Sequence, residues 1–154
     1  MSKLATRIHN KLYVGAFPPA KLKDKGFDVV VLCAQEKQDV RPDIPTIRVP
    51  FDDGPLPNKD YQRAVKAAMA VTKLRKLGKR VLVTCHQGVN RSAFVAALSL
   101  MQLERLNANS AINLVRTARQ PDVGSWRVLG NDDFEKALYH FEGLARGRAT
   151  PWKR

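Results

Sequence analysis

The sequence predicts a single α/β domain whose central, mostly parallel sheet of four to five strands is flanked by helices. Short apolar runs alternate along the chain with amphipathic segments, which is the order of elements in α/β folds. Two of these runs, FDVVVL and RVLVT, are rich in β-branched residues and almost continuously apolar, as strands covered on both faces are. A chain of 154 residues is long enough to bury one substantial core.

Four strands and four helices account for the pattern. The strands are expected at residues 11–14, 27–32, 46–49 and 80–84. A first helix is expected over residues 58–77, where apolar side chains recur every three or four positions and Gly78 provides the end. A second helix over residues 92–106 is apolar on most sides, which predicts a place at the centre of the domain.

The last two helices are identified by their caps and their apolar stripes. Asn109 is expected to cap the third helix, and Asn131 or Asp132 to open the fourth. The folded domain is therefore expected to span residues 1–145. Residues 146–154 are expected to form a basic C-terminal tail.

The chain is strongly basic. Its formal net charge is +13, from 27 lysines and arginines against 14 aspartates and glutamates. Such an excess favours anionic partners, among them phosphoproteins, nucleic acids and acidic membrane surfaces. Residues 73–80, KLRKLGKR, carry five of the positive charges. We interpret them as a solvated helix end rather than a nucleic-acid patch, because no aromatic residues are interleaved with them.

Targeting and metal-binding signals are not found in the sequence. The opening residues MSKLATRIHNKLYVG have no apolar region of a secretory signal, and the longest apolar runs are too short to cross a bilayer. A cytoplasmic location is therefore expected. Two cysteines and three scattered histidines form neither a disulfide framework nor a zinc site. No metal or cofactor is expected, and each cysteine is either a small buried residue or a reactive thiol.

The segment CHQGVNRS, from Cys85 to Ser92, connects the strand at 80–84 to the central helix. A cysteine six residues before an arginine is weak evidence alone. In a strand–loop–helix connection, however, backbone N–H groups and the positive end of the helix dipole converge on one anion site. The same field stabilises a thiolate at Cys85, and Gly88 permits a close backbone approach. A buried cysteine at a strand end is the alternative interpretation.

The other side chains of this loop fit anion chemistry. Arg91 can hold two phosphate oxygens in a bidentate contact. Ser92 places a hydroxyl beside the sulfur, where it can hydrogen-bond the thiolate. The candidate phosphate loop is completed by His86, Gln87, Gly88, Val89 and Asn90. His86 contacts a substrate at the rim of the site or is simply an exposed loop residue.

A reaction through a phosphoenzyme also needs a proton donor for the departing oxygen. Residues 49–57, VPFDDGPLP, offer Asp52 and Asp53 after the third strand, in a segment that glycine and proline keep out of a helix. The alternative is a turn that only caps the next helix, and these residues taken alone favour that alternative.

Two segments resemble one enzyme family. CHQGVNRS, with a strand before it and an apolar helix after it, resembles the signature loop of the dual-specificity branch of the protein tyrosine phosphatases. VPFDDGPLP resembles the acid loop of the phosphatases of regenerating liver, in which the second aspartate is the general acid. Asp53 precedes Cys85 by 32 residues, close to the roughly thirty residues of that family. With IHNKLYVGAFPP, FDVVVLC and GNDDFEKAL, the resemblance covers residues 8–145.

The resemblance implies a protein tyrosine phosphatase-like fold and a metal-free reaction in two steps. Cys85 attacks phosphorus, while Arg91 and the amides of the loop bind the phosphate oxygens. Asp53 protonates the leaving group and then activates water, and Ser92 helps the thiolate to leave.

Two positions near the nucleophile need separate comment. Thr84 stands where the family usually has a histidine that holds the loop, so the reaction rate is expected to depart from that of the family. Cys33 ends the strand VVVL, and the resemblance implies a reversible Cys33–Cys85 disulfide under oxidation. A small buried residue is the alternative interpretation of Cys33.

The predicted function is cysteine-dependent hydrolysis of phosphomonoesters on proteins, both phosphotyrosine and phosphoserine or phosphothreonine. RNA 5′-triphosphate ends and phosphoinositides remain alternative substrates, because the charge of +13 suits both and HxGxNR resembles the RNA triphosphatases. A non-catalytic phosphate-binding module is the alternative from another class. The low-molecular-weight phosphatases place the cysteine before the acid, the reverse of the order here. The sequence fixes neither a partner nor an oligomeric state.

Overall fold

The computed structural model describes residues 5–16, 26–36, 43–147 and 151–152. A five-stranded sheet has the order β1-β2-β5-β3-β4. The elements are β1 (Ala5–His9), β2 (Leu12–Gly15), β3 (Val29–Leu32), β4 (Thr46–Arg48), α1 (Asn58–Lys76), β5 (Val81–Thr84), α2 (Arg91–Leu103), α3 (Ala108–Arg119), the short 3₁₀ helix η2 (Gln120–Asp122) and α4 (Asp132–Ala145). The predicted single α/β domain is confirmed.

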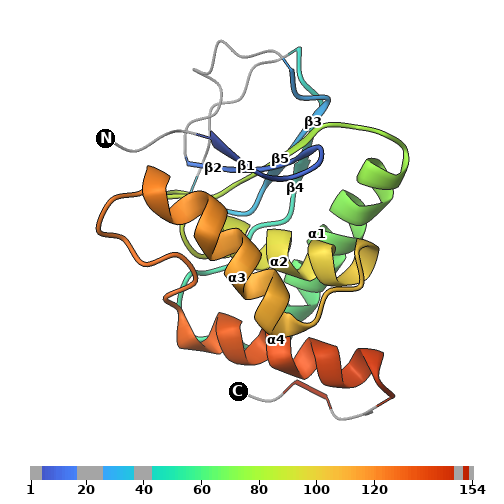
Figure 1. The fold of residues 1–154 in the computed structure, drawn as a ribbon, viewed down its shortest axis with the longest axis vertical. Coiled ribbons are helices and arrows are strands. Elements are labelled where there is room, and N and C mark those ends of the chain that lie inside the picture. Colours follow the sequence, from blue (N-terminus) through green and yellow to red (C-terminus); the bar gives the residue numbers. More distant parts are fainter. Residues whose placement is uncertain (1–4, 17–25, 37–42, 148–150, 153–154) are drawn as a thin grey trace.

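Strand β5 lies at the centre of the sheet and pairs in parallel with β2 on one side and β3 on the other. Only the β1–β2 hairpin is antiparallel, so the sheet is mixed but mostly parallel, as predicted. All four residues of β5 are buried, which explains its continuous apolar pattern. In the described part of the chain, the α-helices gather on one side of the sheet (Figure 1).

Helix α2 is the central helix that its apolar composition predicts. Residues 91–101 are all buried, because α2 packs against the sheet, α1, α3 and α4. Its Phe94 stacks on Phe134 of α4, with ring centroids 4.7 Å apart, and Phe51 meets both rings edge-on. Phe51 belongs to the loop after β4, so this aromatic cluster anchors that loop to the N-terminal end of α2.

Several element boundaries differ from the prediction. The first predicted strand corresponds to β2, and the additional strand β1 precedes it. Asn107, not Asn109, caps α3, because its side-chain oxygen accepts a hydrogen bond from the Ser110 N–H at 2.8 Å. Asn109 lies inside the helix, since Ala108 already has to face the core. The fourth helix is capped by Asn131, whose side chain accepts bonds from two N–H groups of the first turn.

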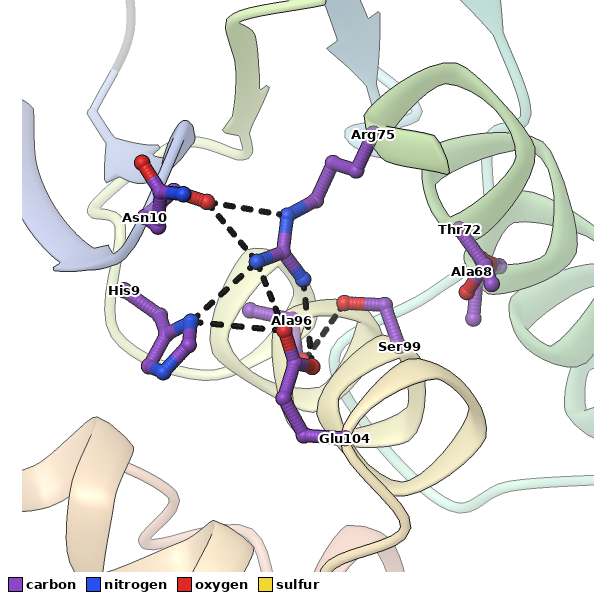
Figure 2. A network of polar contacts seen from close by, with 8 residues as sticks. All are labelled: His9, Asn10, Ala68, Thr72, Arg75, Ala96, Ser99 and Glu104. Carbon is purple, nitrogen blue, oxygen red and sulfur yellow. Dashed lines mark hydrogen bonds and ion pairs between the residues drawn. The ribbon is translucent and has the colours of Figure 1, made fainter. Parts of the chain in front are cut away.

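The basic segment 73–80 is not uniformly solvated, which corrects the prediction. The Arg75 side chain is only 3% exposed and bonds to Glu104 at 2.9 Å and to the Asn10 carbonyl at 2.7 Å. Figure 2 shows the guanidinium between the β1–β2 turn and the end of α2, with His9 beside it. The Arg80 guanidinium lies 4.8 Å from the ring centroid of Tyr13. Of the five basic side chains in the segment, only the lysines at 73, 76 and 79 are exposed.

Candidate active site

The segment CHQGVNRS forms the loop between β5 and the first turn of α2. Cys85 follows the central strand directly, is 2% exposed and donates its backbone N–H to the Gly15 carbonyl. Thr84 is fully buried, with its hydroxyl 3.5 Å from the Val31 carbonyl. The start of the loop is therefore fixed to the strands on both sides of β5.

Gly88 is the residue around which the loop turns. Its φ is +68°, and a Cβ built on it would lie 2.8 Å from the Gly15 carbonyl oxygen and 2.5 Å from the Arg119 guanidinium. An L side chain here would be strained and would also collide with backbone. Gly88 therefore combines a positive φ with the close backbone approach that a glycine permits.

Arg119 of α3 holds the loop through its backbone carbonyl groups. It is fully buried and donates from Nε to the Gly88 carbonyl at 2.9 Å and from Nη1 to the Thr6 hydroxyl at 2.8 Å. Burial lowers the pKa of Arg119, while Asp122 and Cys85 raise it. The sequence analysis missed this residue. Its signal was a position one turn after Val115, in the buried stripe of the third helix.

The sulfur and the hydroxyl predicted to act together are in contact. Cys85 Sγ lies 3.2 Å from Ser92 Oγ, and Ser92 is fully buried in the first turn of α2. His86 and Gln87 are exposed, whereas Val89 is buried and its carbonyl accepts the Leu129 N–H. Of the loop side chains, those at 86 and 87 therefore face solvent.

Arg91 begins α2 and is 5% exposed. Its Nη1 lies 3.3 Å from the Phe51 carbonyl oxygen and 3.4 Å from Glu36 Oε2. Among the described residues, its buried Nε has no hydrogen-bond partner. A guanidinium held on one side with a donor left over suits an anion with several acceptor oxygens.

Glu36 is a second residue that the sequence analysis missed. A hydrogen bond from its own backbone lowers the pKa of Glu36, and the Arg91 guanidinium lowers it further against the opposing effect of burial. The carboxylate therefore stays ionised and orients the Arg91 side chain. The only sequence signal was an acidic residue shortly after the strand VVVL, which is indistinguishable from a solvated loop residue.

Among the described contacts, a hydrogen bond connects the Asp53 side chain to the loop, and none connects Asp52 to it. Asn90 Nδ2 donates to Asp53 Oδ2 at 3.1 Å, and Asn131 Nδ2 donates to Asp53 Oδ1 at 3.1 Å. The same Asn131 side chain also caps α4, because its oxygen accepts the hydrogen bonds from the first turn of the helix. The Asp53 side chain is exposed. The structure thus brings a carboxylate, 32 residues earlier in the chain, to the edge of the loop.

Cys33 and Cys85 follow paired strands. The register pairs Leu32 with Thr84, so the two cysteines occupy adjacent positions just beyond β3 and β5. Both are free thiols, and Cys33 is fully buried. Burial raises the pKa of Cys33, and the nearby Cys85 raises it further. Cys33 is therefore a thiol rather than a thiolate at neutral pH.

The two histidines outside the loop take part in other contacts. His9 is part of the Arg75–Glu104 network, and His140 packs against Tyr61 and Trp152. Trp126 is 56% exposed in the connection between α3 and α4. Among the described residues, no group of three His, Cys, Asp or Glu side chains could hold a metal ion. No described helix is long and apolar enough to cross a membrane.

Comparison with known proteins identifies what this geometry resembles. The sequence model of the dual specificity phosphatase catalytic domain matches residues 12–143. The tyrosine phosphatase homologue 123R of Invertebrate iridescent virus 6 is 27% identical over 138 residues, which cover 89% of this chain and 91% of that protein.

Solved structures show the same fold. Human DUSP28 superposes with a TM-score of 0.81 at 22% identity, covering 95% of this chain and 97% of that one. OH1 from the Orf virus, a tyrosine phosphatase described as having triple substrate specificity, gives a TM-score of 0.65 at 20% identity, covering 92% of this chain and 87% of that one.

Proposed function

The chain belongs to the dual specificity phosphatase family, and on that premise we propose that it hydrolyses phosphomonoesters through a phosphocysteine formed on Cys85. The observation that carries this proposal is the loop itself. The sulfur of Cys85 lies 3.2 Å from the Ser92 hydroxyl, and Arg91 follows at the N-terminus of the central helix. A sulfur nucleophile, a guanidinium and a helix N-terminus within one loop suit nucleophilic attack on phosphorus.

Binding of the phosphate uses the same groups. Arg91 donates to two of the non-bridging oxygens, since its Nε has no partner among the described residues. The backbone N–H groups of residues 86–91 bind the three oxygens as charge develops on them. Glu36 and the Phe51 carbonyl hold the guanidinium in place, and Arg119 holds the loop.

The first chemical step forms a phosphorus–sulfur bond and breaks the phosphorus–oxygen bond of the ester. The Cys85 thiolate supplies the electron pair, and the leaving oxygen takes a proton from Asp53. This role of Asp53 is supported by its bonds to Asn90 and Asn131 at the loop edge. The same role is implied by the resemblance of VPFDDGPLP to the acid loop of the phosphatases of regenerating liver.

The second step releases inorganic phosphate. Asp53, now a carboxylate, takes a proton from water, and the hydroxide oxygen attacks phosphorus as the phosphorus–sulfur bond breaks. The Ser92 hydroxyl donates a hydrogen bond to the departing thiolate. Both steps are written without a metal ion.

Phosphotyrosine and phosphoserine or phosphothreonine on intracellular proteins are the proposed substrates. The family and the viral tyrosine phosphatase homologue support protein substrates. RNA 5′-triphosphate ends and phosphoinositides are kept as a second candidate class, because the net charge of +13 favours polyanions.

The proposed reaction is tested with a substrate panel on the purified protein. Phosphotyrosine peptides, phosphothreonine peptides, a phosphoinositide and a 5′-triphosphorylated RNA are compared, with Cys85→Ser as the blank. Cys85→Ser is expected to abolish turnover and to keep phosphate binding, and wild-type activity is expected to persist in EDTA. Turnover by Cys85→Ser would contradict the phosphocysteine, and loss of activity in EDTA would contradict a reaction without metal.

We also propose that Cys33 protects Cys85 from irreversible oxidation. Peroxide oxidises the Cys85 thiolate to a sulfenic acid, and the Cys33 thiol then forms a disulfide with it, releasing water. The adjacent positions of the two residues beyond β3 and β5 support this reaction.

A further inference from the structure

Trp152 lies within residues 146–154, which the sequence predicts to be a basic tail. Arg148, Lys153 and Arg154 are outside the described residues. Trp152 itself is only 9% exposed, and the described residues 151–152 lie beside α4 (Figure 1). Its indole stacks on Tyr61 of α1 with ring centroids 5.7 Å apart, and it meets His140 of α4 edge-on at 5.5 Å.

The indole N–H is used as well as the ring. Trp152 Nε1 donates to the backbone carbonyl of Leu56 at 2.8 Å, in a buried hydrogen bond. The N–H of Leu56 donates to Asp133 of α4 at 2.9 Å, and the Leu56 side chain is fully buried. Both polar backbone groups of Leu56 are therefore held by side chains, one from α4 and one from the C-terminal segment.

Leu56 follows Asp53 by three residues, in a segment without helix or strand. Three residues span at most about 11 Å, so a shift at Leu56 is transmitted directly to Asp53. The other end of the segment is held by Asn131, which donates to Asp53 and to the Gly54 carbonyl. The conformation of this segment thus depends on side-chain hydrogen bonds at both of its ends.

We propose that Trp152 is a positioning residue for Asp53: its indole N–H fixes Leu56, and thereby fixes the loop that carries the acid. The inference rests on the proposed role of Asp53 as general acid. Loss of the N–H donor leaves the buried Leu56 carbonyl without its partner, so the backbone moves to find another. A small displacement of a proton donor is costly, since about 1 Å can reduce a rate by up to about a hundredfold.

The two aromatic side chains that contact Trp152 each carry a buried polar atom without a hydrogen bond among the described residues. Within the described residues, the buried Tyr61 hydroxyl and His140 Nε2 have no hydrogen-bond partner. Burial raises the pKa of Tyr61 to about 12. Withdrawal of the indole gives water access to both groups, which offsets part of the lost apolar burial. The position of the loop is therefore expected to respond to small changes at residue 152.

Trp152→Phe isolates the hydrogen bond, because phenylalanine keeps an aromatic ring against Tyr61 and removes the N–H. The measurement is kcat/KM on two aryl phosphates, since this ratio reports cleavage of the phosphorus–oxygen bond. Phenyl phosphate has a strongly basic leaving group that needs the acid, and 4-nitrophenyl phosphate has a weakly basic one. We expect a loss of about tenfold on phenyl phosphate and less than about twofold on 4-nitrophenyl phosphate.

Two further variants make the result interpretable. Asp53→Asn is expected to lose at least about a hundredfold on phenyl phosphate and much less on 4-nitrophenyl phosphate. In the Asp53→Asn background, Trp152→Phe is expected to add no further selectivity, because both changes act on one proton transfer. Tyr139→Phe is the control, because it removes a hydroxyl from a 46% exposed ring on α4. Its kcat/KM should be unchanged on both substrates.

The outcomes separate this inference from the proposed function. A selective loss in Asp53→Asn together with equal losses, or none, in Trp152→Phe overturns the role of Trp152 and keeps Asp53 as the acid. Equal losses on both substrates in Asp53→Asn overturn the acid itself, and the inference with it. A selective loss in both variants, without additivity, establishes Trp152 as a positioning residue.

Discussion

Arg119 is a buried side chain that binds the backbone of the loop between β5 and α2. Its buried guanidinium bonds to the Gly88 carbonyl and, at 3.4 Å, to the Gln87 carbonyl. The Thr6 hydroxyl accepts from Arg119 and donates to Asp122. Carbonyls that point down to Arg119 leave the N–H groups of the loop free to point toward an anion. We propose that the buried cation thereby prepares the opposite side of the loop for an anion.

Arg119→Met tests this arrangement. The loss of two carbonyl contacts and of the cation beside Asp122 is expected to destabilise the protein by roughly 3 kcal/mol, measured by urea unfolding. Inorganic phosphate should inhibit the variant at least about tenfold more weakly, because the backbone N–H groups of the loop no longer point toward the anion. Lys136→Met, on an exposed position of α4, is the control. Unchanged inhibition by phosphate would contradict the role of Arg119 in the loop.

The two cysteines give a prediction on oxidation. Because burial raises the pKa of Cys33, the fraction of Cys33 thiolate is small at neutral pH and increases as the pH rises. Disulfide closure after peroxide treatment is therefore expected to accelerate with increasing pH. Intact-mass analysis measures the disulfide against sulfinic and sulfonic products of Cys85. If Cys85 in the Cys33→Ser variant resists over-oxidation as well as it does in the wild type, the proposal of a protective disulfide is wrong.

At the scale of elements, the C-terminal ends of α1 and α2 are joined to the β1–β2 turn by one buried cation. Arg75 of α1 bonds to Glu104, just after α2, and to the Asn10 carbonyl in the turn (Figure 2). His9 Nδ1 lies 3.3 Å from Glu104. The network lies at the opposite end of α2 from Arg91, about 20 Å away along the helix. Its role is therefore expected to be the assembly of the fold and not the reaction.

Arg75→Met separates stability from activity. The variant leaves the Glu104 carboxylate and the Asn10 carbonyl without their donor, so we expect a loss of about 2 kcal/mol in the free energy of unfolding. At a temperature where the variant is fully folded, kcat/KM should stay within about twofold of the wild type. Lys73→Met on the exposed side of the same helix should change neither quantity. A large loss of kcat/KM in a folded Arg75→Met protein would contradict this separation.

At the scale of the whole molecule, the sheet order decides which distant residues meet. Because β5 lies between β2 and β3, the segments after all three strands converge where the central strand ends. Gly15 ends β2, Cys33 follows β3 and Cys85 follows β5. Helices α3 and α4 then supply Arg119 and Asn131. The site is therefore a property of the complete sheet and not of the signature segment alone.

The sequence by itself determined the local features of this protein. Repeated apolar patterns predicted the α/β class, the buried strand β5 and the buried helix α2, because periodicity and continuous apolar runs are visible along the chain. The segment CHQGVNRS suggested the proposed phosphate loop, since its Cys, Gly and Arg lie within eight consecutive residues. The spacing to Asp53 and the family resemblance pointed to the second segment of the proposed site.

Only the tertiary structure decided the contacts between distant segments. Arg119 and Glu36 carry no chemical signature in sequence, because an arginine in an amphipathic helix or an acid in a loop is most often solvated. Asn131 was predicted only as a possible helix cap, and its bonds to Asp53 and Gly54 were not. The same reason explains why Arg75 and Trp152 were assigned to exposed segments. Their burial depends on partners 29 and 96 residues away, Glu104 and Leu56. Such partners are chosen by sheet order and helix packing, which no local pattern encodes.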